Sequence, residues 1–250
     1  MRTIGDLMRA MNRVLAISLV LAACGGGNST SPDAGADAHI FLDAPPVVPS
    51  MITIAGVATE DTQTGSTPLA GVAIGIFKSS DETTALATAT TDAQGKYSVM
   101  IPTGGGVVDG YIKASKSGYA DNYVYPATPF QGDSLAANAN LISSSNFGFL
   151  KVLGGQHAGK GLIVVEILDA NMMSVAGATV TSSPASGSYR YSDSSGTPTS
   201  TTATAADGAA FLFDVPTGHV EISATKAGMT FKTHGLGAHA DQFTTTVITP

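Results

Sequence analysis

The chain has 250 residues, of which 43% are hydrophobic, enough for one or two domains with apolar cores. A formal net charge of −7 excludes binding to nucleic acid through a basic face. The single cysteine excludes an intrachain disulfide, and the 29 glycines and 12 prolines favour short strands and turns over long helices.

Residues 1–23 have the pattern of a secretory signal. Arginines at positions 2, 9 and 13 precede an apolar run over residues 14–23, which ends in small residues. A run of this length is too short to cross a hydrocarbon core of about 30 Å. We therefore expect residues 1–23 to be a signal peptide that directs export.

The end of this segment, Leu21-Ala22-Ala23-Cys24, resembles the lipobox of bacterial lipoproteins. The resemblance implies cleavage before Cys24 and acylation of its thiol and new amino group, so that the protein is held on a membrane. Gly25 stands where an inner-membrane lipoprotein has an aspartate, which favours the outer membrane and the cell surface.

Residues 24–50 are rich in Gly, Ser, Asp, Ala and Pro, a composition that cannot form a core. We expect a disordered tether between the anchor and the folded body. As a flexible chain it would span about 28 Å.

The rest of the chain contains one sequence pattern twice. Four features follow in the same order in both copies. They are a Gly-containing turn, a turn that ends in Gly before a strand, a Pro-Thr-Gly break and a Lys-x-Gly turn. The first copy places these features at residues 68–74, 91–97, 101–104 and 116–118, and the second at 174–180, 204–211, 215–218 and 226–228. The recurrence predicts one structural unit used twice.

Alternating apolar and polar residues, separated by turns, predict six or seven short strands in each copy. In the first copy the expected strands cover residues 51–59, 72–77, 84–91, 97–101, 111–115 and 122–125. In the second they cover residues 161–168, 179–182, 211–215, 220–225, 231–234 and 242–248.

The first copy also resembles a known family. The order Pro-Leu-Ala-Gly at 68–71, Thr-Asp-x-x-Gly-Lys-Tyr at 91–97, Pro-x-Gly at 102–104 and Gly118-Tyr119 is similar to carboxypeptidase regulatory-like domains. The resemblance implies a transthyretin-like, Ig-like β-sandwich and says little about function. We expect an all-β protein with two tandem seven-stranded sandwiches, at 51–130 and 161–250.

Residues 131–160 are expected to connect the sandwiches through a short helix over 143–153, ended by Gly154 and Gly155.

Residues 154–160 match the first seven positions of a phosphate-binding P-loop. The eighth position is Gly161 instead of Ser or Thr, and a strand follows where a P-loop opens a helix. We therefore reject a nucleotide site.

The densest group of metal-ligand residue types is His234, His239 and Asp241. The glycines between the two histidines would leave them poorly ordered, so we expect a solvated loop and no metal or other cofactor. No nucleophile elbow and no His-Glu-x-x-His motif occurs, although a Ser-His-Asp site formed in space stays open.

Tyr119, Tyr123 and Tyr125 allow two interpretations. They could form a flat platform for stacking sugars, or they could fill a core or an inter-domain contact, which the lack of tryptophan favours. The sequence thus predicts a lipid-anchored surface protein with non-catalytic binding or structural modules. Its expected partners are the membrane, through Cys24, and a protein or polysaccharide at the cell surface. A carbohydrate-binding accessory protein is the alternative, followed by a hydrolase or metal-binding protein.

Overall fold

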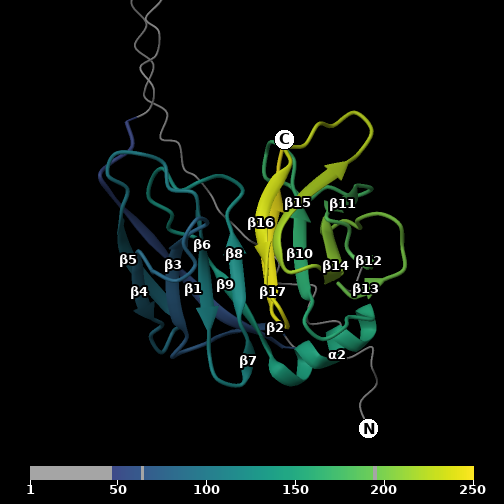
Figure 1. Ribbon diagram of the computed structural model, residues 1–250, viewed down its shortest axis with the longest axis horizontal. Helices are drawn as coiled ribbons and strands as arrows, with labels where there is room; N and C mark the ends of the chain where they lie inside the picture. The colour runs from purple at the N-terminus through teal and green to yellow at the C-terminus, as the bar shows by residue number, and fades with distance from the viewer. Residues whose placement is uncertain (1–46, 63–64, 194–195) are drawn as a thin grey trace, which may run out of the picture.

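The computed structural model describes residues 47–62, 65–193 and 196–250 (Figure 1). Within these residues the chain is almost entirely β-structure, with one helix, α2 (Ser144–Gly154). The predicted signal peptide, Cys24 and residues 25–46 of the tether lie outside the described residues.

The strands form three sheets. The first contains β2 (Gly65–Pro68), β1 (Met51–Thr62), β9 (Ala139–Ser143) and β7 (Tyr119–Ala120) in that order, with β5 (Lys96–Pro102) also paired to β1. The second sheet runs β13 (Pro198–Thr199), β12 (Ser188–Ser192), β14 (Ala209–Val215), β10 (Gly161–Ile167), β17 (Phe243–Ile248), β8 (Asn122–Tyr125), β6 (Gly110–Ser115), β3 (Ala73–Lys78) and β4 (Ala87–Thr90). The third contains β11 (Thr179–Ser183), β15 (Gly218–Thr225) and β16 (His234–Ala238).

The two sequence repeats have the same topology. In the first repeat β1 pairs antiparallel with β5 and parallel with β9, and in the second β10 pairs antiparallel with β14 and parallel with β17. The opposing layers also match, because the order β3, β6, β8 recurs as β11, β15, β16. The strand pairings within the two sequence repeats therefore correspond to each other.

A buried threonine ties the Gly-containing turn in both repeats. The Thr91 hydroxyl donates to the carbonyl of Leu69 at 2.7 Å and accepts the N–H of Val72 at 3.0 Å. The Thr204 hydroxyl makes the same two bonds, to the carbonyl of Val175 at 2.6 Å and from the N–H of Ala178 at 2.9 Å. The recurring sequence pattern thus encodes a recurring hydrogen-bond pattern.

The expectation of two separate tandem sandwiches is wrong in one respect. The last strand, β17, lies between β10 of its own repeat and β8 of the first repeat and pairs in parallel with both. One nine-stranded sheet therefore runs through both repeats (Figure 1). Each repeat adds a smaller sheet to this shared one, and the two repeats form a single body.

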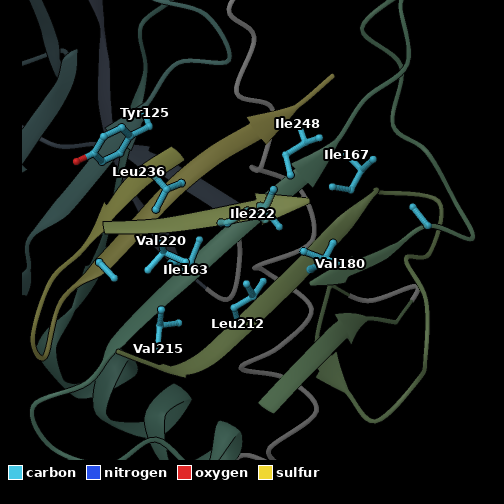
Figure 2. Packing of buried hydrophobic residues seen from close by; sticks show 14 of the residues in the cluster. Tyr125, Ile163, Ile167, Val180, Leu212, Val215, Val220, Ile222, Leu236 and Ile248 are labelled. Carbon is cyan, nitrogen blue, oxygen red and sulfur yellow. The ribbon is translucent and has the colours of Figure 1, made fainter. Parts of the chain in front are cut away.

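Both faces of the shared sheet are buried in its middle. Strand β10 shows the alternation, since Ile163, Val165 and Ile167 contribute to the apolar cluster shown in Figure 2. That cluster includes residues of β11, β15 and β16. The opposite face of β10, with Leu162 and Val164, belongs to a second cluster that contains residues of α2. A third cluster fills the first repeat, between β1 and β5 on one side and β3 and β6 on the other.

Helix α2 begins and ends one residue later than predicted. Phe147 and Leu150 are buried against the shared sheet, as its apolar spacing requires. Gly155 follows the last turn with φ of 70°, the left-handed conformation that commonly ends a helix.

Besides the short strands β2, β7 and β13, which were not predicted, three strands of five residues differ from the sequence prediction. Strand β9 falls within the expected connector and completes the first repeat by pairing with β1. Strand β12 forms within the Ser- and Gly-rich segment after Pro184, to which no strand was assigned. The strand expected over 231–234 instead spans His234–Ala238 as β16. Its glycines fit because a side chain at Gly237 would crowd the hydroxyl of Tyr125, 2.8 Å from the Cβ position.

Candidate functional site

The three tyrosines considered as a sugar platform do not lie together on an exposed face. Tyr123 and Tyr125 are buried, whereas Tyr119 is half-buried and donates its hydroxyl to Glu60 at 2.8 Å. Tyr125 stacks on Tyr111, with ring centroids 4.9 Å apart, and borders the core of the second repeat beside Leu236 (Figure 2). Stacking of a sugar needs exposed rings, so the geometry favours the contact between repeats.

Tyr123 joins the two repeats through His239. Their rings are stacked, with centroids 3.5 Å apart and planes 11° from parallel. Lys113 lies 5.2 Å from the centroid of the Tyr123 ring and forms an ion pair with Asp121 at 3.1 Å. Burial, together with the positive charge of Lys113, lowers the pKa of His239 to about 4. His239 is therefore a neutral, stacked side chain at neutral pH.

His234 and Asp241, the other two metal-ligand candidates, have separate structural partners. The Nδ1 atom of His234 lies 2.9 Å from the hydroxyl of Thr246, and burial lowers the pKa of this imidazole. Asp241 forms an ion pair with Lys151 of α2 at 2.7 Å and accepts the N–H of Gly159 at 3.0 Å. Over residues 47–62, 65–193 and 196–250, no group of three or more His, Cys, Asp or Glu side chains is placed to hold a metal ion.

The segment that partly matches a P-loop is held by carboxylates of the chain itself. Asp214 accepts the N–H of His157 at 2.9 Å and contacts its Nδ1 atom at 3.0 Å, while Asp241 accepts the N–H of Gly159. A P-loop offers such N–H groups to phosphate. Here helix α2 precedes the segment and β10 follows it, so both the order of elements and the N–H partners agree with rejection of a nucleotide site.

The histidines that the structure describes do not form a Ser-His-Asp arrangement. His157 contacts Asp214, His219 contacts Glu221 at 2.8 Å, His234 contacts a threonine and His239 contacts a tyrosine ring. In this part of the chain, no hydrogen bond joins a serine hydroxyl to any of these rings. The charged and polar residues that were candidates for a site in the sequence thus stabilise turns and the contact between repeats.

Sequence reasoning missed the polar residues at that contact. Asn122 is fully buried on β8, donates to the carbonyl of Asn140 at 2.8 Å and accepts the hydroxyl of Thr245 at 3.2 Å. The N–H of Asp121 donates to the side chain of Gln242 at 2.5 Å. An asparagine within an apolar strand was the only sequence signal, because such a buried amide must find hydrogen-bond partners.

Acid is expected to destabilise the protein through His239. The unfolded imidazole takes up a proton near its ordinary pKa of 6.5, whereas the folded one does so only near pH 4. Between pH 4 and pH 6.5 the unfolded state therefore binds more protons than the folded state. The contribution of His239 to stability is fully present above pH 6.5 and is lost as the pH falls toward 4. Thermal unfolding of the wild type at pH 7.5 and pH 5 should show this loss, and His239→Gln should reduce it.

Asp61 acts in the opposite direction and serves as the control for this experiment. Burial raises its pKa from 3.8 to about 7, so its contribution to stability is present below pH 3.8 and is lost as the pH rises toward 7. Asp61→Asn should therefore steepen the loss of stability on acidification, opposite to His239→Gln. Equal slopes in wild type and His239→Gln would contradict the role assigned to His239.

No described helix is both long enough and apolar enough to cross a membrane.

Comparison with protein-family models gives no match, and comparison with curated proteins gives none either. Among solved structures, the Bacillus anthracis TIE protein superposes with a TM-score of 0.26 at 15% identity, over 79% of this chain and 34% of its own. The shaft pilin spaA from Lactobacillus rhamnosus GG superposes with a TM-score of 0.26 at 12% identity, over 80% of this chain and 98% of its own. GBS52, the minor pilin of Streptococcus agalactiae, superposes with a TM-score of 0.27 at 11% identity, over 79% of this chain and 94% of its own. The chain thus spans about a third of the TIE protein, and TM-scores this low assign it to none of these classes.

Proposed function

We propose that the protein is an exported lipoprotein whose two-repeat β-body serves as a non-catalytic structural or binding module at the cell surface. The observation that carries this proposal is the position of β17, which pairs with strands of both repeats and makes them one body. A catalytic protein needs polar groups that converge on a substrate. Here the candidate groups His234, His239 and Asp241 instead support turns and the contact between repeats.

Attachment through Cys24 is part of the proposal. The lipobox-like residues 21–24 lie at the end of a signal-like segment, and they include the one cysteine of the chain. Several acyl chains would hold the protein on a membrane, where a single chain binds weakly. Gly25 supports the outer membrane as the destination, and the tether would place the body away from the lipid surface so that its loops and sheet edges can meet a partner.

The anchor is tested by expressing the full chain in a bacterial host and measuring its intact mass. A mature form that begins at Cys24 and carries acyl groups is expected, together with precursor accumulation when globomycin inhibits the lipoprotein signal peptidase. Cys24→Ala should abolish acylation and leave the protein out of the membrane fraction. A soluble wild-type product without lipid, or an uncleaved chain in untreated cells, would refute the anchor.

A further inference from the structure

Strand β5 has an edge that the described residues leave uncovered. In the register of β1 and β5, Met100 lies opposite Thr53 and Ser98 lies opposite Ala55. The backbone groups of Thr53 and Ala55 bond to Ser134 and Ala137, on the side of β1 that faces away from β5. In an antiparallel ladder, two residues that face each other direct their backbone N–H and C=O groups either both toward each other or both away from each other. The N–H and C=O of Ser98 and Met100 therefore point outward, and no residue of the described chain pairs with them.

The second repeat covers the equivalent edge. Strand β14 corresponds to β5 and carries β12 along its outer side, with Tyr189 opposite Leu212. The neighbouring edge of β11 is also covered, because Val180 and Ser182 donate their N–H groups to the hydroxyls of Tyr191 at 2.9 Å and Tyr189 at 3.2 Å. At the other side of the first repeat, β17 covers β8. The edge of β5, at the far end of the first repeat, has no such cover from the described residues (Figure 1).

The usual devices that protect a sheet edge are weak on β5. Pro102 and Lys96 stand at its two ends, but Ser98 and Met100 between them are exposed, and Met100 is an apolar residue with 59% of its surface accessible. Lys96 is already bonded to Asp92 through both of its backbone groups. The free part of the edge is therefore short and centred on Val99.

We propose that two copies of this chain pair antiparallel through β5 around a two-fold axis at Val99. In this register Ser98 of each copy faces Met100 of the other, so that every outward N–H meets a C=O. Lys96 faces Pro102, which avoids like charges directly opposite each other. The two exposed Met100 side chains lie diagonally across the new strand pair, within reach of each other. Such an isologous contact is the most common kind between identical chains.

This pairing goes beyond the proposed surface module and does not require the lipid anchor. It would continue the sheet of β1 and β5 from one copy into the next. Because few backbone bonds form it, we expect a weak dimer that is favoured at high local concentration.

Disulfide trapping tests the register. On the two-fold axis, Val99 faces Val99 of the second copy as a pair without ladder bonds, whose Cα atoms lie about 4.5 Å apart, within the range of a disulfide. Val99→Cys in the full chain should therefore form a disulfide dimer under a mild oxidant. Thr90→Cys, exposed on the adjacent edge strand β4, should not, and the wild type controls for Cys24. No dimer from Val99→Cys, or equal dimer from Thr90→Cys, would overturn the proposal.

A proline variant tests the backbone contact without a new cysteine. Met100→Pro removes an N–H that makes no bond to any described residue and should weaken dimer formation at least tenfold, measured by sedimentation equilibrium of the full chain. Met100→Ser keeps the N–H and should weaken it less. Circular dichroism confirms that each variant is folded. A monomeric wild type at high concentration, or equal effects of the two substitutions, would contradict strand pairing.

Discussion

Gly154→Ala should destabilise the protein by about 3 kcal/mol, a large effect for the addition of one methyl group. Gly154 is the last residue of α2 and is buried against β14. A Cβ atom at this position would overlap the ring of Phe213, which is fully buried. The helix would have to move away from the shared sheet, and the apolar cluster beneath it would open.

Gly148→Ala in the same helix is the matched control. No atom lies within 4 Å of a Cβ atom at Gly148, and this residue is exposed. Alanine is a better helix former than glycine, so this substitution should stabilise the protein by up to about 1 kcal/mol. Urea unfolding measures both variants, as a shift in midpoint at unchanged slope. A similar result for the two variants would show that close contact between α2 and β14 does not decide stability.

Local patterns were enough to predict most of the elements and the internal repeat. The turn at residues 92–95 illustrates why, because Asp92 accepts N–H groups of Gln94 and Lys96 and Gly95 adopts a φ of 72°. The equivalent Gly208 has a φ of 67°. These bonds form between residues close in the sequence, so the sequence pattern specifies them directly.

The joining of the two repeats could not be predicted in this way. The last strand contains three threonines, which resemble a half-exposed strand, yet β17 is buried over its whole length. The hydroxyls of Thr244 and Thr246 donate to the carbonyls of Gly237 and Tyr125. Those partners belong to other strands, one of them in the first repeat. Burial of β17 depends on pairing between distant segments, which the local pattern does not reveal.

The prediction for the glycine-rich segment around His234 and His239 was wrong for a related reason. Glycines at 235 and 237 suggested a solvated loop, but they occupy strand β16, where neighbouring side chains come too close for a Cβ atom. The histidines next to them are ordered by contacts with Thr246 and Tyr123. The candidate metal residues were therefore clustered in the sequence and separated in the structure.

Asn122→Leu should cost about 2–4 kcal/mol, since it removes a buried amide that bonds the neighbouring strand β17 and strand β9 of the first sheet. The Thr245 hydroxyl of β17 and the carbonyl of Asn140 of β9 would each lose this hydrogen-bond partner inside the protein. The loss falls on the contact between repeats. In calorimetry, the single unfolding transition expected for the wild type should therefore shift down and broaden or split.

The double variant Asn122→Leu with Thr245→Val separates the lost hydrogen bond from the change in packing. Thr245→Val removes the hydroxyl that Asn122 accepts and should restore part of the lost stability, because an apolar pair leaves one fewer buried polar group without its partner. A double-mutant cycle from urea unfolding should then show a coupling energy of about 1 kcal/mol between the two positions. Strictly additive effects would mean that Asn122 stabilises β8 alone and that the two repeats are held together by the strand pairing of β17 and the apolar contacts around it.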